Sequence, residues 1–184
     1  MKRMIIFEGI ASSGKTTLER MLQQELEGSV IISEGQTLMP LIENKEPQKA
    51  VERLMAILDG VEKQSATVFL VDRFHLTHAF RTGASLSFFD GVEERTIKIC
   101  RSLIMLLQMD EDVIFERIKE TALLRGASWQ KGKQGSLEEK VEYYKNQQRI
   151  LIELAKQSRL PSMIVNTTDK DWPRCIREVL TQVS

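Results

Sequence analysis

The chain has 184 residues and carries 26 Lys and Arg side chains against 26 Asp and Glu side chains, so its formal net charge is zero. A neutral chain is not expected to coat nucleic acid or an anionic membrane through bulk charge, which excludes these partners. The length predicts one domain over residues 1–184, because domains commonly have about 100 to 200 residues, and 42% hydrophobic residues are enough for a sizeable core.

The segments that could direct the chain to a membrane or out of the cell are short or lacking. The first apolar run ends at Glu8 after four residues, too early for a signal peptide. Further along, no run approaches the roughly 20 apolar residues of a membrane span. Cys100 and Cys175 have neither metal-binding nor disulfide spacing, so we expect reduced thiols. We therefore expect a soluble, cytoplasmic protein without a membrane partner.

Five short, nearly continuous apolar runs alternate with segments of helical spacing. Continuous runs of this kind predict strands that are buried on both faces of a parallel sheet. The predicted strands are 4–7, 30–32, 68–71, 103–107 and 163–165, and helical spacing covers 16–26, 48–63 and 136–158, with a last helix after Asp171. The alternation predicts an α/β fold in three layers, with a parallel sheet of about five strands flanked by helices.

The strongest motif follows the first predicted strand and reads G-x-x-x-x-G-K-T. Its glycines, Gly9 and Gly14, let the backbone wrap around a phosphate whose charge meets the amides of the next helix. Lys15 is expected to reach the β- and γ-phosphates, and the Thr16 hydroxyl to ligate Mg²⁺. The same loop supplies the remaining predicted phosphate contacts, Ala11, Ser12, Ser13 and Thr17. This P-loop predicts binding of a nucleoside triphosphate, ATP, with Mg²⁺ as the metal cofactor.

Two classes of P-loop protein fit the chain poorly. A regulatory GTPase needs a guanine-reading N-K-x-D, and Asn166-Thr167-Thr168-Asp169 has its outline without the lysine. A mechanical ATPase usually needs more chain for a second lobe. Phosphoryl transfer to a small molecule is therefore favoured.

The third predicted strand ends in an acidic and a basic residue. Asp72 at a strand tip beside the P-loop can hold Mg²⁺ through water, and Arg73 can bind a phosphate or a hydroxyl-bearing substrate in bidentate fashion. The alternative is that Asp72 caps the next helix while Arg73 is solvated. Next to a P-loop we favour the functional interpretation.

At this point the chain resembles the thymidylate kinase branch of the P-loop nucleoside and nucleotide kinases. The resemblance lies in 4–17 and in Asp72-Arg73-Phe74 with the segment 77–83 that follows. It implies that Arg73 clamps the acceptor's phosphate and that Phe74 lines its base or sugar. Less closely, it implies that Arg53 reads the base edge, and it suggests a homodimer.

The segment 110–126 resembles the helix and lid of the same kinases. The resemblance implies that Arg117 lies over the adenine and that Arg125 swings onto the transferring phosphoryl group. Because the middle of the P-loop has no arginine, a lid over about 120–136 is the expected source of that charge. Five residues, 120–124, lengthen the stretch between these two arginines.

One segment departs from the thymidylate kinases. After the second predicted strand they usually carry an R-E-P-G-G-like run, whereas this chain has Ser33-Glu34-Gly35. In deoxynucleoside kinases an acid at this place accepts the proton of the 5′-hydroxyl, and Glu34 can play that part. Either way, Glu34 is expected to contact the substrate.

The residues together predict an ATP-dependent phosphotransferase whose acceptor is a nucleoside monophosphate. The first alternative is a deoxynucleoside kinase with Glu34 as base. Two further alternatives stay open: a kinase for a non-nucleotide small molecule, and a nucleotide-binding regulatory protein without turnover.

Overall fold

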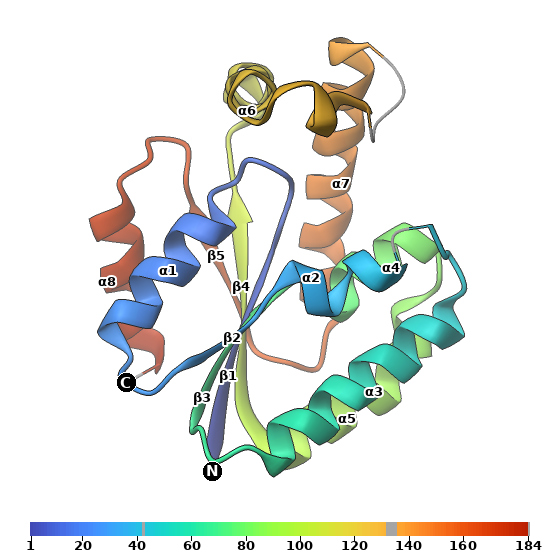
Figure 1. Cartoon of the computed structure of the whole chain (residues 1–184), viewed down its shortest axis with the longest axis vertical. Coiled ribbons are helices and arrows are strands. Elements are labelled where there is room, and N and C mark those ends of the chain that lie inside the picture. The colour runs from blue at the N-terminus through green and yellow to red at the C-terminus, as the bar shows by residue number, and fades with distance from the viewer. Residues whose placement is uncertain (42, 132–135, 184) are drawn as a thin grey trace.

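A computed structural model describes residues 1–41, 43–131 and 136–183, without the side chains of 125–131. Its centre is a five-stranded sheet in which every neighbouring pair is parallel (Figure 1). The strand order is β2-β3-β1-β4-β5, with β1 Lys2–Gly9, β2 Val30–Ile32, β3 Val68–Asp72, β4 Cys100–Gln108 and β5 Ser162–Asn166. The predicted number of strands and their parallel direction are confirmed.

Helices cover both faces of the sheet, which confirms the three layers (Figure 1). The described residues include α1 Lys15–Glu25, α2 Glu34–Thr37, α3 Pro47–Lys63, α4 His75–Thr82, α5 Asp90–Ile99, α6 Glu111–Lys131, α7 Leu137–Gln157 and α8 Trp172–Val183, with short 3₁₀ turns η1 Met39–Leu41 and η2 Leu86–Phe89. The predicted capping box of α7 is present: Ser136 Oγ accepts from the Glu139 amide at 3.2 Å, and Glu139 Oε2 accepts from the Ser136 amide at 2.8 Å.

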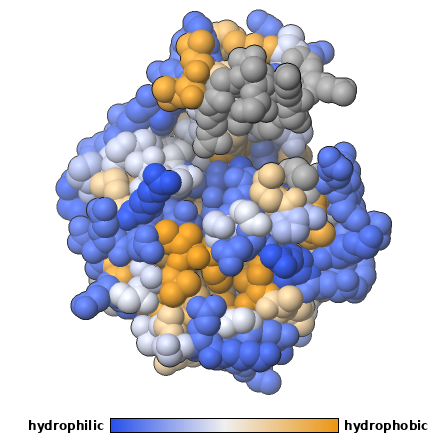
Figure 2. Space-filling model, viewed as in Figure 1, coloured by the Kyte–Doolittle hydropathy of each residue, from blue (hydrophilic) through white to orange (hydrophobic). Residues whose placement is uncertain are grey.

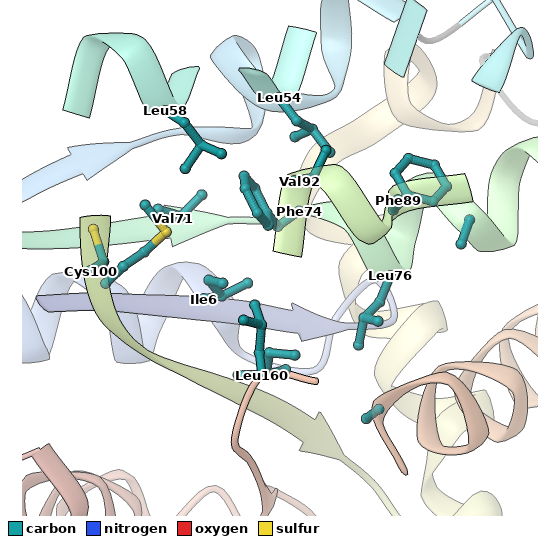
Figure 3. Packing of buried hydrophobic residues seen from close by; sticks show 14 of the residues in the cluster. Ile6, Leu54, Leu58, Val71, Phe74, Leu76, Phe89, Val92, Cys100 and Leu160 are labelled. Carbon is teal, nitrogen blue, oxygen red and sulfur yellow. The ribbon is translucent and has the colours of Figure 1, made fainter. Parts of the chain in front are cut away.

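The hydrophobic core is divided by the sheet because successive side chains of a strand point to opposite faces. Met4 and Ile6 of β1 pack with α3, α4, α5 and α7 (Figure 3), whereas Ile5 and Phe7 pack with α1 and α8. A third cluster around Ile10 joins the P-loop to α6 and α7. These clusters fix the strand ends from which the polar loops emerge.

The structure also bears on the predicted lid, on the cysteines and on membrane-spanning helices. The first part of the predicted lid, up to Lys131, continues α6 as regular helix, while 132–135 lie outside the described residues. Both cysteines are free and buried, and across the described ranges no helix is long and apolar enough to cross a membrane.

The surface is mostly hydrophilic on the face drawn in Figure 2, with apolar patches in its middle and near the top. The top is the end of the molecule at which α6 lies in Figure 1, and Leu123 and Leu124 of that helix are strongly exposed.

The chain leaves β1 in one direction for β2 and later returns beside β1 on its other side as β4, so the strand order reverses around β1. In open α/β sheets, ligands bind beyond the carboxyl ends of the strands at such a reversal. Gly9 of β1 and Asp72 of β3 end at this edge, because Phe7 and Asp72 are register partners.

Candidate functional site

The P-loop has a backbone shape that few residue types allow. Gly9 has φ +141° and Gly14 has φ +96°, and a Cβ at Gly9 would lie 2.7 Å from the Leu107 carbonyl oxygen. Ser12 also has a positive φ, 66°. Helix α1 follows with Gly14 as its N-cap and no side-chain cap, so its first amides are left for another acceptor. This loop geometry suits a phosphate.

Lys15 lies across the mouth of this loop. Its Nζ donates to the carbonyl oxygens of Gly9 and Ile10 at 3.1 and 2.9 Å, and its side chain is buried. Burial, together with the nearby positive charge of Arg73, lowers the pKa of Lys15 to about 8. The negative charge of a bound phosphate would favour the protonated form of Lys15 and so raise its pKa again.

The other predicted loop contacts have separate roles. Ser13 is buried, and its hydroxyl donates to the Ile10 carbonyl at 2.9 Å, which braces the turn. Ser12 donates to Thr121 of α6 at 2.7 Å and so ties the loop to the base of the predicted lid. Ala11 is half-buried, and Thr17 is exposed.

Thr16 and Asp72 fit the proposed metal site by their chemistry. Thr16 is exposed at the start of α1, while Asp72 is buried and its Oδ1 has no hydrogen-bond partner. Burial raises the pKa of Asp72. A buried carboxylate oxygen without a partner and a threonine hydroxyl are both oxygen donors of the kind that Mg²⁺ prefers.

Arg73 joins the P-loop to the predicted acceptor side. Its Nη1 donates to the Gly9 carbonyl oxygen at 3.1 Å, and its Nε donates to Glu34 Oε1 at 2.8 Å. The backbone of Arg73 has φ +63°, an uncommon value for a residue with a side chain, and its amide donates to the Phe7 carbonyl oxygen at 2.9 Å. Lys15 and Arg73 thus share one acceptor, the carbonyl oxygen of Gly9.

Glu8 fixes the segment that follows Arg73 by hydrogen bonds, a role not predicted from the sequence. It is fully buried, and its Oε1 accepts from the amides of Phe74 and Thr77 at 2.9 and 3.2 Å. Its Oε2 accepts from the Thr77 hydroxyl. The available signal was a charged residue directly after the apolar run 4–7 and directly before the P-loop.

The expected substrate contact of Phe74 needs correction. Its ring has no exposed surface and lies inside the core with Leu54 and Val71 (Figure 3). The backbone around the ring is held in place, since Glu8 accepts from the Phe74 amide and Arg73 has a positive φ. Phe74 therefore anchors the segment by packing, and it offers no surface to a substrate.

The remaining acceptor-side prediction concerns Arg53. It lies on α3, and its Nε donates to the Gln36 carbonyl of α2 at 2.7 Å. The structure thus places Arg53 against the helix that carries Glu34, and its contact with a base stays a prediction.

A second acid missed by the sequence analysis is Glu19. It lies one turn after Lys15 on the buried face of α1, and its Oε1 has no hydrogen-bond partner. Burial, reinforced by the charge of Asp72, raises the pKa of Glu19 to about 7. The available signal was a glutamate between the apolar positions Leu18 and Leu22.

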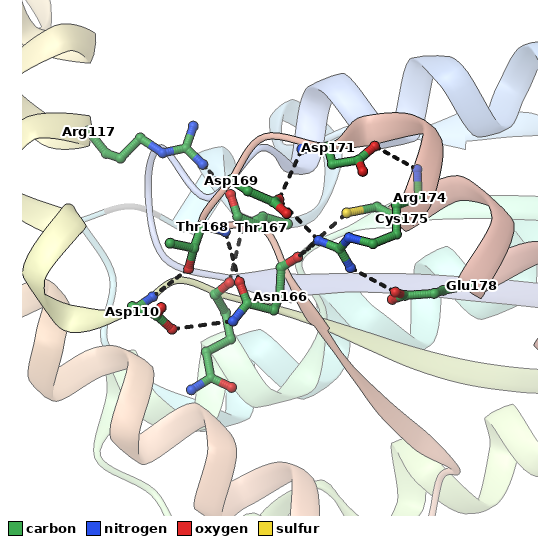
Figure 4. Close-up of polar contacts among 11 residues, drawn as sticks. Asp110, Arg117, Asn166, Thr167, Thr168, Asp169, Asp171, Arg174, Cys175 and Glu178 are labelled. Carbon is green, nitrogen blue, oxygen red and sulfur yellow. Dashed lines mark hydrogen bonds and ion pairs between the residues drawn. The ribbon is translucent and has the colours of Figure 1, made fainter.

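The predicted donor side lies across the P-loop, at α6. Arg117 is buried, and its Nη2 donates to the Thr167 carbonyl in the loop after β5 at 2.5 Å (Figure 4). Its guanidinium carbon is 5.9 Å from the centre of the Trp172 ring. The side chain of Arg125 lies outside the described residues, so its role stays a prediction.

The chain resembles kinases in sequence and in fold. No family model matches the chain. It is 27% identical over 142 residues to the probable thymidylate kinase 1 of Saccharolobus solfataricus, a match over 65% of this chain and 71% of the relative.

Two solved structures share the fold over almost the whole chain. The YorR protein of Bacillus subtilis, in complex with phosphorylated GDP, has a TM-score of 0.68 at 16% identity and is matched over 98% of this chain and 95% of its own. The thymidylate kinase of Ehrlichia chaffeensis has a TM-score of 0.61 at 16% identity, with both chains covered completely, at 100% each. The predicted resemblance and fold are confirmed: the chain resembles a thymidylate kinase in sequence and shares the fold of the P-loop kinases.

Proposed function

We propose that the protein transfers the γ-phosphoryl group of ATP, with Mg²⁺, to a nucleoside monophosphate. The observation that carries this proposal is the Gly9 carbonyl oxygen, which accepts from Lys15 Nζ and from Arg73 Nη1 at 3.1 Å each. One cation belongs to the donor loop and the other to the acceptor side. Transfer between two phosphates needs such charges side by side, because the transition state spreads negative charge over the phosphoryl oxygens.

The chain's own residues hold the donor and the metal. The amides of the P-loop and Lys15 bind the β- and γ-phosphates, and Thr16 and Asp72 hold the metal with their oxygens. Bound Mg²⁺ would neutralise phosphate charge and polarise the phosphoryl group.

On the acceptor side, Arg73 orients the attacking phosphate and Arg53 faces the base. An acceptor oxygen forms a bond to the γ-phosphorus while the bond to the bridging oxygen breaks, and ADP leaves. Arg125 of the proposed lid, about 120–136, stabilises the charge in transit. Positioning and electrostatics therefore account for the rate.

A specific contact favours a second candidate, a kinase for nucleosides. Arg73 donates to Glu34 Oε1 at 2.8 Å, so in the ligand-free protein the clamp for a phosphate is paired with a carboxylate. Glu34 lies on the first turn of α2, and 39% of its side chain is exposed, within reach of solvent and substrate. There it can act as the base for a 5′-hydroxyl.

The test of both candidates is turnover with ATP and Mg²⁺ against a panel of nucleosides and nucleoside monophosphates. Lys15→Ala should lower the rate at least about 100-fold with the true acceptor. If no acceptor raises ADP release above background hydrolysis in the wild-type protein, the proposed function is wrong.

Glu34→Gln separates the two acceptors. With a nucleoside, loss of the base should lower kcat by about 100-fold or more. With a monophosphate, kcat should persist and the acceptor's KM should stay equal or fall, because Arg73 is released from its carboxylate. Glu27→Gln, an exposed glutamate after α1, is the matched control.

The homodimer, the single domain and the cytoplasmic location stay part of the proposal. The dimer is checked by light scattering of the full chain, with and without nucleotide.

A further inference from the structure

Two buried carboxyl oxygens beside the P-loop lack a hydrogen-bond partner. Across the described residues, Glu19 Oε1 and Asp72 Oδ1 are both without one, although each of these residues is only 5% exposed. Burying a carboxylate is strongly unfavourable unless a partner compensates for the lost water. An unsatisfied group of this kind therefore points to a bound ion, a water molecule or a proton.

The two carboxyl groups lie on the same side of the sheet. Asp72 ends β3, and alternation along the strand puts its side chain on the face of Val68 and Leu70. Those two residues pack with Leu18 of α1, the helix that covers this face together with α8 (Figure 1). Glu19 is on the buried side of α1, and after burial the charge of Asp72 contributes most to raising its pKa. The two acids therefore face each other between α1 and the end of β3.

The two cations of the site are engaged elsewhere. Lys15, one turn before Glu19 on α1, donates to two carbonyl oxygens of the P-loop. Arg73 donates to Glu34 and to a carbonyl oxygen of the same loop. Within the described part of the chain, the two acids thus face each other without a direct ion pair to either cation.

A divalent cation fits between these acids. Mg²⁺ is usually bound through one or two carboxylates, and it keeps several waters and contacts substrate phosphates. Thr16 and Asp72 supply a hydroxyl and one carboxylate. Glu19 lies three positions after Thr16 on α1, and side chains at this spacing are neighbours on a helix. Glu19 can therefore supply the second carboxylate.

We propose that Glu19 is a ligand of the metal site together with Asp72, so that the protein binds one divalent cation before any nucleotide is present. The inference rests on the proposed function for the identity of the metal. Its test uses the cation alone and needs no turnover.

The test titrates Mn²⁺ into the nucleotide-free protein by calorimetry, at a mildly alkaline pH at which both acids are ionised. Mn²⁺ prefers the same oxygen ligands as Mg²⁺, which should displace it. The wild-type protein should bind one Mn²⁺ per chain. Glu19→Gln and Asp72→Asn should each raise the Kd by about tenfold or more. Glu25→Gln, at the exposed end of α1, is the matched control and should stay within about twofold, because solvent screens its charge.

Thermal unfolding gives a second readout. A cation that binds only the folded protein raises the Tm with its concentration. The Tm of the wild-type protein should therefore rise with Mn²⁺ much more than the Tm of Glu19→Gln. Without metal the glutamine variant avoids a buried charge and should be the more stable of the two, and saturating Mn²⁺ should narrow this difference.

Glu19→Asp separates a ligand from a general charge. It keeps the negative charge but withdraws the carboxylate by one methylene group, so the Kd for Mn²⁺ should rise by about threefold or more. An unchanged Kd in Glu19→Asp would contradict the inference, since long-range attraction would then account for the binding.

Absence of Mn²⁺ binding in the wild-type protein would overturn the inference outright. Equal affinities of the wild-type protein and Glu19→Gln would do the same, because Glu19 would then be only a buried acid. Failure of the proposed function has a different signature: Mn²⁺ binds through Glu19, yet no acceptor raises ADP release.

Discussion

Replacing Glu19 by glutamine should stabilise the protein, and the gain should depend on pH. Glu19 is buried beside Asp72, which raises its pKa from 4.5 to about 7. A folded-state pKa above the unfolded value favours the protonated acid in the fold. Its stabilising effect is therefore complete below about pH 4.5 and is lost as the pH rises through about 7. Glutamine resembles the neutral acid and cannot ionise.

The size of the effect follows from the two pKa values. Ionisation of Glu19 destabilises the fold by about 1 kcal/mol at about pH 5 and by about 3 kcal/mol at about pH 8. Urea unfolding of both proteins at these two pH values gives the free energies of unfolding. The advantage of Glu19→Gln should grow by about 2 kcal/mol between them.

The control is Glu25→Gln at the exposed end of the same helix, expected to change stability by less than about 0.5 kcal/mol at either pH. If Glu19→Gln has the same effect at both pH values, Glu19 does not titrate in this range and the argument from its burial fails.

Three further predictions concern the backbone and its supports. Gly14→Ala should lower the free energy of unfolding by about 2 kcal/mol or more, because it combines φ +96° with a clash against the Trp172 ring at 2.4 Å. Gly28→Ala, at φ +71° with open space around it, is the control and should cost about 1 kcal/mol. Equal losses in urea unfolding would rule out the clash. Glu8→Gln weakens the hydrogen bonds to two amides and a hydroxyl, so the free energy of unfolding should fall by about 1 to 3 kcal/mol and the acceptor's KM should rise. A loss of stability with an unchanged KM would contradict the positioning role of Glu8. Ser136→Ala removes the cap of α7 and should cost about 1 kcal/mol by the same assay, and unchanged stability would mean that water replaces the cap.

The strands were predictable because their burial is written in the sequence. The run 30–32 is strand β2 residue for residue, and each of the other four runs lies inside a longer strand. The run ends fell short where polar residues such as Lys2 and Gln108 continue the hydrogen-bonded ladder. Apolar content cannot indicate those residues, since neighbouring strands provide their hydrogen bonds.

The P-loop and Arg73 were predictable from residue type at fixed spacing, and their contacts were not. Nothing local indicates that Arg73 meets Glu34, because 39 positions separate them. Phe74 was assigned to the substrate by analogy of position, yet tertiary packing turned its ring into the core. Glu8 and Glu19 were missed because a charged residue in an apolar pattern is first interpreted as the end of that pattern or as exposed.

The Gly9 carbonyl oxygen brings two like charges together at the candidate site, which is locally unfavourable. Two cations meet on one oxygen, and the charge of Arg73 helps to lower the pKa of Lys15. The rest of the fold holds the two positive charges together against their repulsion. A bound anion would lower this repulsive energy and so stabilise the site. We therefore expect anions to protect this edge of the sheet from local unfolding first.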